Sequence, residues 1–254
     1  MQTFLNFVFT EYKGATFVSK GIRDLAAHLT QGCQTPVEKA VRIHDYVREI
    51  PFGFTAWFDA ASPTQTVKVN RGHCNPKGAL FVELLRETGL EARQHVVNID
   101  NRILRGCFSV PPPSPITHSY AEVRLNDRWV KTDSYIVDTQ HFRAAKARLE
   151  KEGEKLGYGV HAKGTNEWDG NTDAFSQFAD PGGMLIEDMG VVGDWQGVVK
   201  KEGYANKAGG LGVSTWLLPA TLVPYGAFQR WINKEIDEVT REVGQSIPQR
   251  SGQL

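Results

Sequence analysis

This chain of 254 residues has few cysteines, no excess of charge of either sign and no long apolar run. Its three cysteines, Cys33, Cys74 and Cys107, are odd in number and widely spaced, which argues against a disulfide framework and favours a reducing compartment. The 29 acidic and 29 basic residues balance, so no electrostatic footprint for nucleic acid or a membrane surface is expected. No stretch approaches a membrane span, and the first residues lack the basic start and apolar run of a signal peptide. We therefore expect a cytoplasmic protein, and the sequence does not define its oligomeric state.

Metal sites and cofactors have little support in the sequence. Residues 169–173 resemble the start of a calcium loop, but Ala174 replaces the glycine of the sharp turn and Asp180 stands where a glutamate is usual. We interpret this segment as a plain acidic loop and expect neither a metal nor a cofactor.

Cys74 lies where a glycine-containing turn is expected to lead into a helix. Apolar residues recur at helical spacing after residues 71–78, and Gly89 is a typical helix stop. Pro76 fits the first turn, where its missing N–H needs no partner. The free N–H groups and the dipole at that helix end should lower the pKa of the Cys74 thiol and bind a developing oxyanion. These features indicate a nucleophile.

A histidine and an aspartate in suitable local structure follow along the chain. Residues 117–125 alternate like a half-buried strand that begins close to His118, and residues 126–133 indicate a turn and a second strand. Pairing of these strands would bring Asp133 near His118. An imidazole can take the thiol proton and return it to a leaving group, and a carboxylate can orient that imidazole. Together with Cys74, these residues predict cysteine-dependent acyl transfer.

The other histidines and cysteines are interpreted as structural or surface residues. Cys33 and Cys107 fit small buried hydrophobic positions. His73, beside the nucleophile, could modulate the pKa of its thiol. The histidines without an assigned role are His28, His44, His95, His141 and His161.

Three motifs resemble those of the transglutaminase-like superfamily, a branch of the papain-like enzymes. They correspond to G-x-C, H-x-(aromatic)-x-E-V and W-V-x-x-D, and stand here as Gly72-His73-Cys74, His118-Ser119-Tyr120-Ala121-Glu122-Val123 and Trp129-Val130-Lys131-Thr132-Asp133. The resemblance covers roughly residues 37–138 by these motifs. It implies an α+β papain-like fold in which the helix carrying the cysteine packs on an antiparallel sheet.

The resemblance also implies a role for each member of the trio. Cys74 would be the nucleophile, His118 the general base and acid, and Asp133 the orienting acid. The expected reaction is transfer or hydrolysis on an amide, ester or thioester through an acyl-enzyme, with a peptide, a protein or a small acyl compound as substrate. The alternatives are a cysteine peptidase or amidase, a biosynthetic enzyme that condenses or cyclises a thioester, and a non-catalytic peptide-binding module. An intact trio argues against the last.

Two positions depart from the family pattern. Asn75 stands where many relatives have an acid after the cysteine. The Trp or Tyr that gives the family its second oxyanion donor has no match, because the equivalent segment carries Phe52 and Phe54, which cannot donate. Trp57 and Gln65 are the candidate donors.

The chain is expected to have two parts. Residues 1–138 would form the catalytic core with its N-terminal helices, and residues 139–254 a C-terminal extension packed on it. In the core, Thr35 should cap a helix that begins at Pro36. The proline-rich loop 110–115 could form one wall of the site.

The extension is expected to be partly helical. Residues 142–156 fit a helix with a solvated face, and residues 157–215 fit irregular structure that could line the acyl cleft. Residues 227–243 fit a helix that docks on the core through an apolar face made of Phe228, Trp231, Ile232, Ile236 and Val239.

Overall fold

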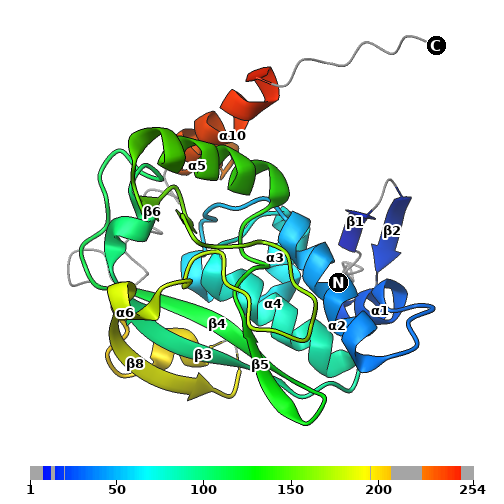
Figure 1. Ribbon diagram of the computed structural model, residues 1–254. Helices are drawn as coiled ribbons and strands as arrows, with labels where there is room; N and C mark the ends of the chain where they lie inside the picture. The colour runs from blue at the N-terminus through cyan, green and yellow to red at the C-terminus, as the bar shows by residue number, and fades with distance from the viewer. Residues whose placement is uncertain (1–7, 13–14, 20, 195, 207–224, 247–254) are drawn as a thin grey trace, which may run out of the picture.

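A computed structural model describes the chain at residues 8–12, 15–19, 21–194, 196–206 and 225–246 (Figure 1). Its main sheet is antiparallel, with four strands in the order β5-β4-β3-β8. These strands are β3 (Ala92–Ile99), β4 (Ile116–Leu125), β5 (Arg128–Thr132) and β8 (Leu185–Val192). None of the helices in the described ranges is both long and apolar enough to cross a bilayer.

The hairpin predicted to carry the histidine and the aspartate is confirmed. Its turn residues Asn126 and Asp127 have φ angles of 50° and 61°, as a two-residue turn that matches the strand twist requires. In register, Leu125 pairs with Arg128 and Ala121 with Thr132. The half-buried character predicted for the first strand is wrong, because almost every side chain of β4 is buried. A second apolar cluster, which includes Phe178 of the extension, covers the face that was expected to meet water.

Helices cover one face of this sheet (Figure 1). They are α1 (Ile22–Leu29), α2 (Pro36–Glu49), α3 (Pro63–Val69) and α4 (Cys74–Glu87). The predicted cap of α2 is confirmed, since the Thr35 hydroxyl accepts the N–H of Glu38 at 3.1 Å. The helix predicted after the glycine turn is confirmed as α4, and Gly89 follows its end with a φ of 84°. Strands β1 (Val8–Tyr12) and β2 (Ala15–Ser19) form a separate hairpin.

A buried lysine anchors the first half of α4. The Lys77 ammonium donates to the carbonyl oxygens of Arg48 at 3.1 Å, Ile50 at 2.7 Å and Ile136 at 2.7 Å. Burial lowers the pKa of Lys77 to about 7, against the attraction of Asp138. These bonds tie α4 to the end of α2 and to the segment after β5, so the start of α4 is held from two sides.

The residues after 138 are more regular than the sequence indicates. The helix α5 (Thr139–Glu152) buries several apolar side chains and packs against α10 (Lys234–Ser246), so it is not simply a solvated helix. The segment expected to be irregular supplies β8, an edge strand of the main sheet, and its residues 207–215 lie outside the described ranges. The smaller elements are η1 (Phe58–Ala60), η2 (Asn101–Leu104), β6 (Leu156–Gly157), β7 (Val160–His161), α6 (Pro181–Met184) and α7 (Gly197–Lys200).

The predicted last helix is interrupted. It forms α9 (Tyr225–Ile232) and α10, with Asn233 between them. Four of its five apolar residues are buried, but Trp231 is 61% exposed, so its predicted place on the docking face is wrong. Trp231 lies at the margin of the stripe that the other four make on the helix surface, where water reaches it.

Candidate active site

His118 and Asp133 lie side by side at the hairpin. His118 is the third residue of β4, and Asp133 directly follows β5. His118 Nε2 lies 3.1 Å from Asp133 Oδ2, and both side chains are almost completely buried. The hairpin therefore brings this histidine and aspartate together as the sequence predicts.

Asp133 is held by a segment of the C-terminal extension. Its Oδ1 accepts the backbone N–H groups of Ser176 and Gln177 and the Ser176 hydroxyl, and its Oδ2 accepts the N–H of Phe178 at 2.8 Å. These bonds hold both oxygens in place, with Oδ2 facing His118. Sequence reasoning missed this cradle, because Ser176 is 43 residues away and backbone donors leave no motif.

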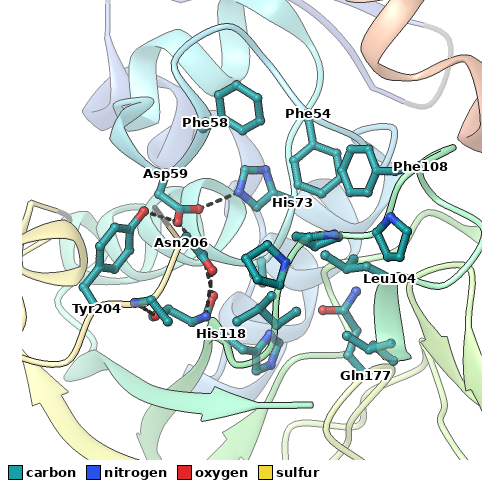
Figure 2. A pocket seen from close by; sticks show the side chains of 18 of the residues that line it. Phe54, Phe58, Asp59, His73, Leu104, Phe108, His118, Gln177, Tyr204 and Asn206 are labelled. Carbon is teal, nitrogen blue, oxygen red and sulfur yellow. Dashed lines mark hydrogen bonds and ion pairs between the residues drawn. The ribbon is translucent and has the colours of Figure 1, made fainter. Parts of the chain in front are cut away.

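Cys74 is the first residue of α4 and lines a cavity of about 340 Å³. His118 lines the same cavity (Figure 2). Burial, reinforced by the negative charge of Asp59, raises the pKa of the Cys74 thiol well above its usual value. Hydrogen bonds with the backbone at Ser119 and Asn75 oppose the shift. The lowered pKa expected from the helix dipole is therefore wrong, because loss of water around the sulfur outweighs it. The raised pKa favours the thiol form of Cys74 over the thiolate.

The cavity walls are mostly apolar. They include the side chains of Phe54, Phe58, Phe108 and Leu104 (Figure 2). Phe52 also lines the cavity. The predicted wall from the proline-rich loop is confirmed by the lining residues Val110, Pro111, Pro112 and Pro113. The extension also lines the cavity, as expected, through Gln177, Tyr204, Ala205 and Asn206.

Neither candidate oxyanion donor is brought to the cavity. Trp57 and Gln65 are both absent from its lining among the residues that the structure describes. The Gln65 side chain instead accepts the N–H of Ser62 at 2.8 Å and so caps α3.

A second buried histidine–aspartate pair lies in the cavity wall. His73 Nε2 is 2.6 Å from Asp59 Oδ1, while Asp59 Oδ2 accepts the Tyr204 hydroxyl at 2.6 Å and the Asn206 amide at 2.7 Å (Figure 2). Burial alone would raise the pKa of Asp59, but the bond and charge of His73 and the two other donors lower it overall. Asp59 lies on η1, and Tyr204 is 145 residues further along the chain, so no local pattern could have found the contact between them.

Three of the histidines without an assigned role have partners inside the fold. His44 contacts Ser134 at 2.8 Å and His141 contacts the carbonyl of Tyr158 at 2.8 Å, so both are satisfied inside the fold. His95 lies between Glu122 at 2.9 Å and Asp188 at 2.6 Å. Within the described part of the chain, no group of three or more potential ligands is arranged for a metal ion.

Comparison with known proteins agrees with this architecture. Residues 23–134 match the family model described as the transglutaminase-like superfamily. This part of the chain, which contains all three residues of the trio, belongs to that superfamily of cysteine-based enzymes, and the predicted α+β papain-like fold is confirmed.

Other comparisons are more distant. A solved chain from Cytophaga hutchinsonii, described provisionally as a cysteine protease, is 16% identical over 43% of this chain, with a TM-score of 0.36. The match spans 35% of that protein's length, and a similarity this low carries no argument about function. No curated protein matches the chain.

Proposed function

We propose that this protein is a cysteine-dependent acyltransferase or hydrolase that forms an acyl-enzyme on Cys74. One observation carries the proposal: His118, which is paired with the buried Asp133, lines the same cavity as Cys74 at the N-terminal end of α4. The superfamily of residues 23–134 supports the same chemistry. All three cysteines are free, which favours a reducing compartment such as the cytoplasm.

In the proposed reaction His118 acts first as a base. It takes the proton of the Cys74 thiol while the sulfur attacks an amide, ester or thioester carbonyl, and the carbonyl electron pair moves to oxygen. Asp133 stabilises the resulting imidazolium, and the N–H groups that donate to its oxygens keep it oriented toward His118. His118 then gives the proton to the leaving group as the tetrahedral intermediate collapses. Water or an amine takes up the acyl group in the second half of the reaction.

The cavity favours a neutral, bulky and apolar acyl group. No lysine or arginine is among its lining residues in the described part of the chain, so an anionic acyl group would lose water without gaining a partner. Four phenylalanines and three prolines are among the residues of the cavity wall. A dry cavity of about 150 Å³ holds a benzene molecule, and the cavity here, about 340 Å³, has room for an aryl group and the reacting carbonyl.

Trapping of the acyl-enzyme tests this function. The protein is mixed with the p-nitrophenyl esters of phenylacetate, acetate and succinate, and its intact mass is followed with time. We expect a mass increase equal to the acyl group, fastest for phenylacetyl and slowest for the anionic succinyl group. The adduct should form on the wild type and on the matched control Cys33→Ala, and be absent from Cys74→Ala. An adduct of unchanged yield on Cys74→Ala would place the chemistry elsewhere.

A second measurement separates transfer from hydrolysis. Addition of a primary amine to the reacting ester should divert the acyl group into an amide if the closed cavity limits water. A product ratio that does not respond to amine concentration identifies a hydrolase.

A further inference from the structure

His73 has one ring nitrogen without a partner. The side chain is 5% exposed, and its ring stacks on Phe54 with centroids 4.4 Å apart. Nε2 is taken by Asp59, whereas the buried Nδ1 has no hydrogen-bond partner. The ring lines the same cavity as Cys74, the next residue in the chain (Figure 2). Buried polar atoms in proteins are nearly always paired, so an unpaired one in a cavity wall points to a group supplied by a ligand.

The charge of Asp59 indicates what this nitrogen can do. The Asp59 side chain is 3% exposed, and a buried carboxylate needs a compensating charge. Of the three side chains that donate to it, His73, Tyr204 and Asn206, only His73 can be a cation. The other titratable groups on the cavity wall are Cys74 of α4 and His118 of β4, with Asp133 behind His118. An imidazolium at position 73 would carry a hydrogen on both nitrogens and leave Nδ1–H as a free donor.

We propose that His73, as an imidazolium paired with Asp59, is a catalytic residue that donates Nδ1–H to the substrate carbonyl oxygen while Cys74 attacks. This inference rests on the proposed function and names the second oxyanion donor, a role that Trp57 and Gln65 cannot fill from outside the cavity wall. Phe54, in the segment expected to carry that donor, instead supports the donor ring by stacking.

The step balances without a further reagent. As the sulfur–carbon bond forms, the carbonyl π pair becomes a lone pair on oxygen, and the N–H of Cys74 and the Nδ1–H of His73 both donate to it. His73 keeps its proton throughout. When the bond to the leaving group breaks, the lone pair returns to the carbonyl and His118 protonates the departing group.

Two reactions of the same sulfur test this role. Acylation by p-nitrophenyl phenylacetate creates an oxyanion, whereas alkylation by iodoacetamide displaces iodide and creates none. The double variant His73→Phe/Asp59→Asn keeps a stacking ring and removes the buried carboxylate together with its partner. We expect its rate of acylation to fall about 10²-fold to 10³-fold, as for loss of one oxyanion donor. Alkylation of Cys74 should be no slower than in the wild type, because the charge of Asp59 no longer raises the pKa of the thiol. His73→Gln retains an N–H and should recover part of the acylation rate.

Several outcomes overturn the inference. The first is acylation at the wild-type rate in the double variant. The second is an equal loss of acylation and alkylation, because His73 would then act on the thiol or on the fold. If the double variant does not fold, the single variant Asp59→Asn is tested instead, since it removes the charge that stabilises the imidazolium. We expect it to lose acylation selectively as well. An unchanged acylation rate refutes the role of His73. Acylation that persists in Cys74→Ala refutes the proposed function as well as the role of His73. If Cys74→Ala abolishes acylation but the His73 variant acylates at the wild-type rate, only the role of His73 is refuted.

Discussion

Cys74 combines the position of an activated nucleophile with the surroundings of an inert one. The start of a helix stabilises a thiolate, but the side chain is only partly exposed and lies near the negative charge of Asp59, and its pKa is raised. These effects favour the protonated thiol before substrate binds. In the proposed reaction His118 therefore removes the proton during the attack.

The pH dependence of alkylation tests this resting state. Because the pKa of Cys74 is raised, its thiolate fraction should still be increasing at alkaline pH, by about tenfold for each pH unit. We expect the iodoacetamide rate at Cys74, measured by peptide mass spectrometry in a Cys33→Ser/Cys107→Ser background, to rise from pH 6 to pH 9 without a plateau. A plateau that begins below pH 7 would show a preformed thiolate–imidazolium pair instead.

Asp133 pairs buried backbone N–H groups in addition to its contact with the His118 imidazole. The family resemblance suggests that an amide could replace it, because papain-like enzymes also use one. Here both carboxylate oxygens accept backbone N–H groups, so the NH₂ of an asparagine would face a donor in either orientation. We expect Asp133→Asn to lower the free energy of unfolding by about 2 kcal/mol, from unpaired buried donors, and to reduce acylation as well.

Urea unfolding followed by circular dichroism measures this change. Ser176→Ala is the matched control, because it removes the hydroxyl that contacts Asp133 and keeps the three N–H donors. Its loss of stability should be smaller. An Asp133→Asn protein with the wild-type midpoint would mean that the cradle adapts to an amide.

Among the elements, the helix pair α9 and α10 holds the loop that supports the site. Asn233, in the break between them, accepts the N–H of Phe54 at 2.7 Å and donates to its carbonyl at 2.9 Å. Gly53 has a φ of 153°, and a Cβ there would overlap the Asn233 side chain. The break in the helix therefore places an amide against the backbone of Phe54, whose ring stacks on His73.

Asn233→Ala should weaken this connection. It leaves a buried N–H and C=O of Phe54 unpaired, so we expect a loss of roughly 1–3 kcal/mol in unfolding free energy and slower acylation. Arg71→Gln serves as the control, since it breaks a partly exposed ion pair with Asp237 of α10 at 3.0 Å and should change stability by less than about 1 kcal/mol. Equal effects of the two substitutions in the urea assay would contradict a special role for Asn233.

At the scale of the whole molecule, the sequence predicts what is encoded locally. The cap at Thr35, the helix after Cys74 and the hairpin that brings His118 to Asp133 follow from residues close together in the chain. Contacts across long stretches of chain could not be predicted in this way. The donors to Asp133, the contact of Tyr204 with Asp59 and the strand β8 depend on tertiary packing, which leaves no periodic signal.

These long-range contacts predict cooperative unfolding. We propose that residues 1–138 and the extension form one unit, because β8 pairs with β3 and α10 packs on α5. Urea denaturation should then give one transition, with coincident curves from far-ultraviolet circular dichroism and tryptophan fluorescence. Two separated transitions would show that the extension unfolds independently.

The donors to Asp133 also determine when, during synthesis of the chain, the site can form. Cys74, His118 and Asp133 leave the ribosome before Ser176, Gln177 and Phe178, and before Tyr204 and Asn206, which bind Asp59. From Asp133 to Asn206 is 206 − 133 = 73 residues, or roughly 4 to 15 seconds of synthesis at about 5–20 residues per second. During that interval the growing chain carries the cysteine without the groups that orient its base. The candidate site can therefore be complete only after synthesis has passed Asn206.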